Sequence, residues 1–228
     1  MYYTQRIELA DRFLTLFAER NQKVFREHWS SEWHMGEKIA QRACGLEGDI
    51  VGVAEFFIET SAEMDVAATL TLGISSVPFS RLWYQWMPDD LHPRTVALHD
   101  ILSCDQELTL EVHDEATLQQ ALDKLQAFLE QQGMPWIHER ATREQILSKL
   151  AAIGDREALE RSILLLAGCG DLDGALRRFE EVLWPQVKGD GERMILERWR
   201  RLKAVILEES EKSIYARKEE ELSQTPVE

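Results

Sequence analysis

The stretch Val66-Ala67-Ala68-Thr69-Leu70-Thr71-Leu72-Gly73-Ile74 alternates apolar residues with small or polar ones along its whole length. A period of two places the apolar side chains on one face of an extended strand and the others on the opposite face. Residues 107–112, Glu-Leu-Thr-Leu-Glu-Val, repeat the alternation with glutamates at the polar positions. Such alternation is typical of antiparallel sheets with one face in water. The two segments therefore predict half-buried antiparallel strands.

The residues before these strands predict a third strand and a leading helix. Residues 50–58 are rich in β-forming residues, and we expect the intervening residues 61–65 to form a hairpin turn. Nearer the start of the chain, apolar residues recur at steps of three and four, which is the spacing of one helix face. These residues are Ile7, Ala10, Phe13, Leu14, Phe17, Val24 and Phe25.

Two capping patterns predict the helices that follow the strands. Asp114 is a suitable N-cap for an amphipathic helix, which we expect to end at Gly133. Thr142 begins a Thr-Arg-Glu-Gln sequence, which fits a capping box, and its helix is expected to end at Gly154. This part of the chain is therefore predicted to be helical.

Three more helical segments are expected towards the C-terminus. Residues 155–167 and 172–184 flank a Gly-Cys-Gly turn, and Pro185 is expected to end the second segment. A last helix is expected after Gly191, with Trp199 and Leu202 on its apolar face, and the charged residues from Glu208 onward are expected to fray.

Together these elements predict the α+β class, with a small antiparallel sheet packed with helices and a helical C-terminal extension. We expect an α+β domain over residues 1–150. Residues 151–228 are expected to form the extension, a hairpin followed by a long helix and a charged tail.

Negative charge is concentrated in the middle of the chain. The 228 residues include 41 acidic and 26 basic side chains, a formal net charge of −15. Residues 43–118 hold fourteen acidic residues and only two basic ones, Arg81 and Arg94, a net of −12. Such a field favours a basic protein partner and repels nucleic acid and anionic membranes. With no long apolar segment and no signal-peptide pattern, the chain is expected to be soluble and cytoplasmic.

The segment from Pro78 to Asp90 predicts contact residues for such a partner. Trp and Tyr dominate the energetics of protein interfaces, and carboxylates beside them would orient a basic surface. The alternative is that the segment is a long connection that crosses the sheet and that its rings cover the core. The predicted partner-binding residues are Trp83, Tyr84, Trp86, Asp89, Asp90, Glu59, Glu63 and Asp65.

Catalytic and metal-binding patterns are weaker. His92, His99, Cys104 and His113 are zinc-ligand types, but their spacing fits no standard site. His99, Asp100 and Ser103 are hydrolase residue types without a nucleophile elbow. Cys44, Cys104 and Cys169 form no paired motif, and buried packing is expected for Cys44 and Cys169. We therefore predict a non-enzyme that requires no cofactor and no metal.

Two resemblances bear on this interpretation. Residues 158–183 carry a helix, a Gly170-Asp171 turn and an Ala175-x3-Phe179 pattern, and they resemble one tetratricopeptide-type helical hairpin. A single hairpin implies no peptide-binding groove. The order of elements, with a helix that ends in Gly133-Met134-Pro135-Trp136, resembles uncharacterised bacterial immunity-type domains found beside toxins.

The second resemblance implies an immunity or antitoxin-type inhibitor that neutralises a basic toxin by stoichiometric binding. Two alternatives stay open. One is an enzyme with an unrecognised carboxylate or histidine site in residues 89–115, for example Asp100, Asp105 and Glu107. The other is an adaptor or chaperone that uses the helical hairpin.

Overall fold

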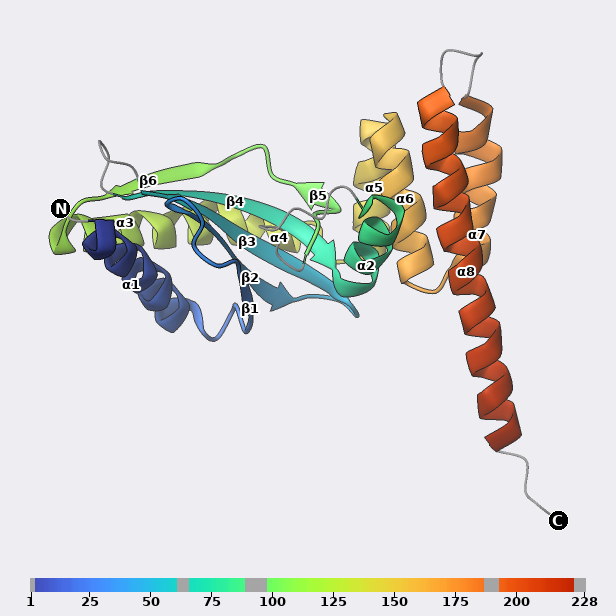
Figure 1. Ribbon diagram of the computed structural model, residues 1–228, viewed down its shortest axis with the longest axis horizontal. Helices are drawn as coiled ribbons and strands as arrows, with labels where there is room; N and C mark the ends of the chain where they lie inside the picture. Colours follow the sequence, from blue (N-terminus) through green and yellow to red (C-terminus); the bar gives the residue numbers. More distant parts are fainter. Residues whose placement is uncertain (1–2, 61–65, 89–97, 187–192, 224–228) are drawn as a thin grey trace.

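The computed structural model describes residues 3–60, 66–88, 98–186 and 193–223. It confirms the α+β class: a helix precedes an antiparallel sheet, and helices make up most of the second half of the chain. The sheet and the last helices lie at opposite ends of an elongated molecule (Figure 1). The predicted division at residue 150 stays a prediction. It falls within α5 (Arg143–Ile153).

The sheet contains more strands than the sequence predicted. Strand β3 (Ile50–Glu59) pairs antiparallel with both β2 (Glu37–Gly45) and β4 (Val66–Ser76). Strand β1 (Glu27–Ser30) pairs with β2, whereas β5 (Leu102–Ser103) and β6 (Leu108–Val112) both pair with β4. The three predicted strands are thus confirmed as β3, β4 and β6. The predicted turn at residues 61–65 lies outside the described residues.

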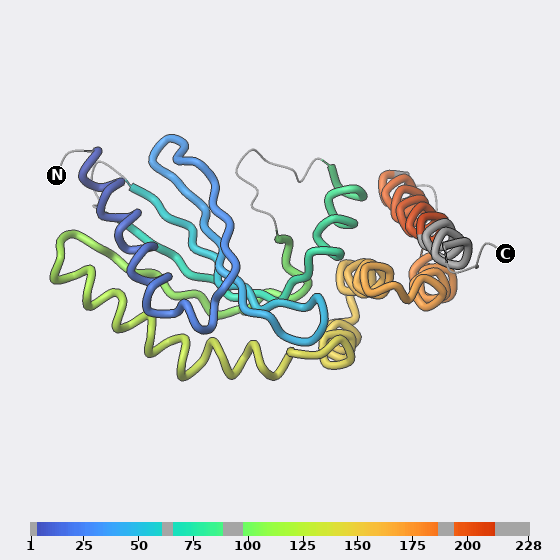
Figure 2. The backbone as a smooth tube through the Cα atoms, turned by 90° about the horizontal axis from the view of Figure 1, so that it is seen from below, coloured from blue at the N-terminus to red at the C-terminus, as the bar shows by residue number. Residues whose placement is uncertain are grey.

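Helices cover one face of the sheet. Phe56 of β3 contacts Phe13 and Phe17 of α1 (Tyr3–Asn21), with ring centroids 5.9 and 4.7 Å apart. Helix α3 (Glu115–Phe128) packs on β6, on the same side of the sheet as α1 (Figure 2). Together these contacts bury the apolar residues on this face of the strands in one continuous core, whereas Ala43, Val51 and Val53 on the other face form a smaller cluster with Leu98.

The two predicted N-caps are confirmed, but one predicted helix C-terminus is wrong. The Asp114 carboxylate accepts a hydrogen bond from the backbone of Thr117, and Thr142 and Gln145 form a capping box. Gly154 ends α5 in the left-handed conformation, with φ of 68°. Gly133, in contrast, lies in a π turn (η2, Leu129–Gly133) that leads into α4 (Met134–His138). Pro135 does not break α4, because it occupies the first turn.

The remaining helices form the extension. Helix α6 (Arg156–Gly168) precedes α7 (Leu172–Arg178), which continues as a π turn (η3, Phe179–Leu183) and a short 3₁₀ turn (η4, Trp184–Gln186). Helix α8 (Arg193–Ser223) packs against α7 and projects beyond it (Figure 1). The predicted fraying from Glu208 is therefore wrong for the backbone, which stays helical to Ser223.

Residues 77–86 form a helix, not the connection that the sequence suggested. In α2 (Val77–Trp86) the Ser76 hydroxyl accepts a hydrogen bond from the backbone N–H of Phe79, and Pro78 fits the first turn. The buried residues of α2 recur at helical spacing and pack against α6 and α8. Helix α2 thus joins the sheet to the extension.

Candidate protein-binding surface

The second face of the sheet is strongly acidic. Cross-strand pairing places Glu27, Glu37, Glu55, Glu59 and Glu111 on the same face, with Phe57, Thr69 and Thr109 among them. We call this surface the acidic face. Among the strand residues that the structure describes, none of those on this face is Lys or Arg, since Lys38 and Arg42 alternate to the other face.

One row across the acidic face contains three glutamates. Glu37 of β2 lies directly opposite Glu59 of β3, and Glu59 lies opposite Ala67 of β4, which pairs in turn with Glu111 of β6. The row thus brings three glutamates to one edge of the acidic face, two of them on neighbouring strands.

A polar cluster lies at the centre of the acidic face. The side-chain amide of Gln41 donates hydrogen bonds to Glu55 Oε2 at 2.6 Å and to the Leu98 carbonyl at 3.0 Å. Gln41 also accepts a hydrogen bond from the backbone N–H of Leu98 at 3.2 Å. Leu98 itself packs on Val51 and Val53. Gln41 therefore fastens the chain at Leu98 to this face.

Asp100 is the most perturbed carboxyl group in this region. A side chain at Gly73 would overlap the Asp100 carboxyl group, so glycine makes the room that Asp100 occupies against β4. Burial, followed by the nearby charge of Glu55, raises the pKa of Asp100 to about 7. A hydrogen bond from Ser103, at 3.2 Å, and the charge of Arg161 oppose this rise. Burial likewise raises the pKa of Glu55.

The residue types of a hydrolase do not converge here. Ser103 donates to Asp100, but the imidazole of His99 stacks on Trp83, with ring centroids 4.0 Å apart. Asp105 and Glu107 are exposed on the connection from β5 to β6. The sequence drew attention to Asp100, whereas nearby Glu55 was missed, because only the folding of residues 98–100 onto the sheet brings the two together.

The predicted aromatic anchors lie mostly in the core. Trp86 is 0% exposed and Trp83 is 4% exposed, as the core alternative requires, whereas Tyr84 is half-buried. Glu59 is exposed on the acidic face. The other predicted partner-binding residues, Asp89, Asp90, Glu63 and Asp65, lie outside the described residues.

The cysteines and the zinc-type residues have different surroundings. Cys44 is buried, which raises the pKa of its thiol, but Cys169 is exposed, so the expectation of burial was wrong for Cys169. His92 lies outside the described residues. Within the described part of the chain, no three His, Cys, Asp or Glu side chains converge as metal ligands.

In the described ranges, every helix is too short or too polar to cross a bilayer. Comparison with protein-family models, with curated proteins and with solved structures finds no significant match to the chain, so its function is inferred from the surface described above.

Proposed function

We propose that the protein is a binding protein whose acidic face engages a basic surface of another protein. The observation that carries the proposal is the gathering of carboxylates on this face: Glu37 lies directly opposite Glu59 on the neighbouring strand, and Glu111 lies in the same row beyond Ala67 of β4. A cationic surface of a partner would be attracted to this concentration of carboxylates.

The proposed contact is a polar surface with few apolar anchors. Phe57 and Trp29 are half-buried on the acidic face, and Thr69 and Thr109 supply hydroxyl groups that hydrogen-bond to each other at 3.2 Å. On such a surface, charge orients the partner and speeds its association, whereas a few central aromatic rings supply most of the affinity. Phe57 takes the anchoring role in this proposal, because Trp83 and Trp86 are buried.

The specific role we propose is that of an immunity or antitoxin-type inhibitor. A basic toxin, for instance one that acts on nucleic acid, carries a cationic substrate surface that the acidic face would complement. Stoichiometric occupation of that surface requires neither a cofactor nor a catalytic group. Protection of cells that express the product of an adjacent toxin gene would test this role directly.

Reversing the charge of the acidic face is expected to slow association with the partner. The triple variant Glu27→Lys, Glu59→Lys, Glu111→Lys changes three exposed carboxylates of this face. At low salt its association rate should fall by about tenfold or more, and the rate should lose its salt dependence. The measurement is the rate of association with the purified partner, captured by affinity from cells of the source and followed at several salt concentrations.

A matched control separates the surface from the net charge. The variant Glu19→Lys, Glu130→Lys, Glu181→Lys makes the same change in net charge at exposed helix positions away from the acidic face. It should retain most of the association rate. Equal slowing by both triple variants would show that net charge acts without a specific surface, and the proposal would fail.

One observation favours a second candidate, an acid–base enzyme. Asp100, with a pKa of about 7, lies in the electrostatic field of Glu55, and paired carboxyl groups of this kind serve as general acids and bases. Loss of a turnover in Asp100→Asn, with partner binding unchanged, would support the enzyme. Because Asp100 lies against Gly73 and Ser103, we favour a structural role for it.

A further inference from the structure

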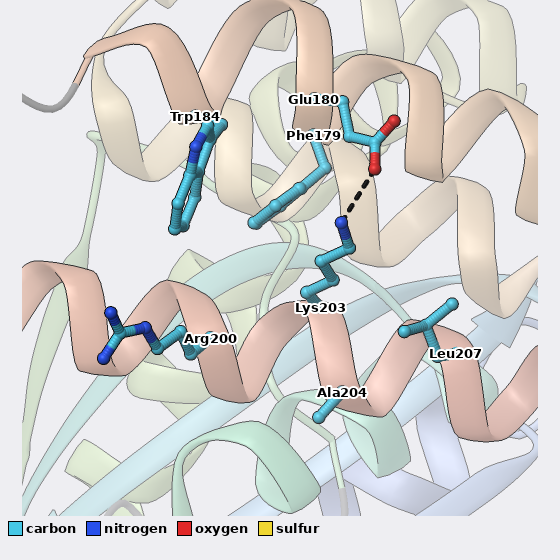
Figure 3. A pocket seen from close by; sticks show the side chains of 7 residues that line it. All are labelled: Phe179, Glu180, Trp184, Arg200, Lys203, Ala204 and Leu207. Carbon is cyan, nitrogen blue, oxygen red and sulfur yellow. Dashed lines mark hydrogen bonds and ion pairs between the residues drawn. The ribbon is translucent and has the colours of Figure 1, made fainter.

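A groove on the helical extension carries exposed apolar side chains. It lies between η3 and α8, has a volume of about 450 Å³, and is lined by Phe179, Glu180, Trp184, Arg200, Lys203, Ala204 and Leu207 (Figure 3). Trp184 is 40% exposed and Leu207 is 43% exposed. Val182 and Met194 add exposed apolar surface on the same extension, whereas the sheet domain has only scattered examples. Concentrated exposed apolar surface is typical of an interaction site.

Helix α8 presents a regular stripe along this groove. Arg200, Ala204, Leu207 and Glu211 are all exposed and are separated by four, three and four residues. This is the spacing of the seam of a coiled coil, in which side chains of one helix enter holes of another. Helix α8 also projects beyond α7 (Figure 1), and Glu211, about one turn after Leu207, does not line the groove.

The stripe is complementary to itself when it is reversed. In an antiparallel pair related by a two-fold axis between residues 205 and 206, Arg200 of one helix lies opposite Glu211 of the other, and Ala204 lies opposite Leu207. The first pairing joins opposite charges, and the second places a large apolar side chain beside a small one. Lys203 is already paired with Glu180 at 2.7 Å, so it does not oppose the arrangement.

We infer that a second copy of this chain occupies the groove, with the two α8 helices packed antiparallel across a two-fold axis. Each Leu207 enters the groove of the other copy beside Ala204 and Phe179, and covers exposed apolar surface there. Each Arg200 forms an ion pair with Glu211 of the other copy. The dimer uses neither the acidic face nor its partner, so it stands independently of the proposed function.

Charge exchange between two positions tests the dimer. Wild-type protein should sediment with twice the mass of one chain, and dilution should dissociate it. Arg200→Glu and Glu211→Arg should each raise the dimer dissociation constant by about tenfold or more, because each changes two symmetry-related pairs to repulsive ones. The double variant should regain most of the wild-type affinity. Failure of the double variant to recover would overturn the pairing.

Two further variants, one disruptive and one control, test the dimer. Ala204→Arg places a long charged side chain at the closest approach and should abolish the dimer, while thermal melting confirms that the exposed position tolerates it. Arg201→Glu, an exposed position that does not line the groove, should leave the dimer unchanged. A wild-type protein that is monomeric at every concentration overturns the inference, as does a dimer that is insensitive to Ala204→Arg.

Discussion

Trp86→Ala is expected to lower the free energy of unfolding by about 3–5 kcal/mol, the range found when a fully buried Trp is truncated. Trp86 is 0% exposed, and its indole N–H donates a hydrogen bond to the Arg198 carbonyl at 2.8 Å. The Arg198 guanidinium also lies over the Trp86 ring, 4.5 Å from its centroid. Truncation therefore leaves a cavity and removes a contact between α2 and α8 at the same time. Denaturant unfolding measures the loss.

The position of Trp86 explains why the effect should reach the extension. Arg198 donates a hydrogen bond to the buried carboxylate of Glu160 on α6, and so does the indole of Trp199. Burial raises the pKa of Glu160, and these two donors oppose the rise. Trp86, Arg198 and Glu160 thus tie three helices together through one cluster.

Tyr84→Ala is the matched control on the same helix. Tyr84 is only half-buried, so its truncation should cost clearly less than that of Trp86. If Trp86→Ala unfolds at the wild-type denaturant concentration, the ring is not the core contact that we describe.

The sequence predicted elements whose signals are local. The alternation in residues 66–74 identifies β4, and Asp114 and Thr142 mark the starts of their helices, because a cap and a periodic pattern act within a few residues. Strand β2 was missed because Lys38 and Arg42 lie on its covered face, where the pattern expects apolar residues. Lys38 is accommodated there by an ion pair with Asp11 at 2.8 Å.

The aromatic segment was misinterpreted as partner contacts, with a connection across the core as the alternative, although the spacing of Phe79, Leu82, Trp83 and Trp86 is that of a helix face. The acidic face needed more than any such pattern, because only the register brings Glu37, Glu59 and Glu111 into one row. The concentration of charge was visible in the sequence, but the surface that bears it depends on pairing between distant strands.

Asp100→Asn is expected to stabilise the protein above about pH 7 by roughly 2–4 kcal/mol, since each pKa unit corresponds to about 1.4 kcal/mol. Folding raises the pKa of Asp100 from 3.8 to about 7, so the folded protein holds a proton that the unfolded chain has released. Wild-type stability should therefore fall as the pH rises from about 4 to about 7. Asparagine has nearly the same shape as aspartate but does not ionise, so the stability of the variant should lack the pH dependence that Asp100 causes.

The measurement is a series of urea-unfolding curves across this pH range for the wild type and for Asp100→Asn. Below about pH 4 the two proteins should have similar stability, because Asp100 is then protonated in both the folded and the unfolded chain. Asp105→Asn removes an exposed carboxylate nearby and should follow the wild-type profile. Parallel profiles for the wild type and Asp100→Asn would contradict the assignment. The buried charge at neutral pH would then have to be compensated by Arg161, which opposes the rise in the pKa of Asp100 and donates a hydrogen bond to the Ile101 carbonyl at 3.1 Å.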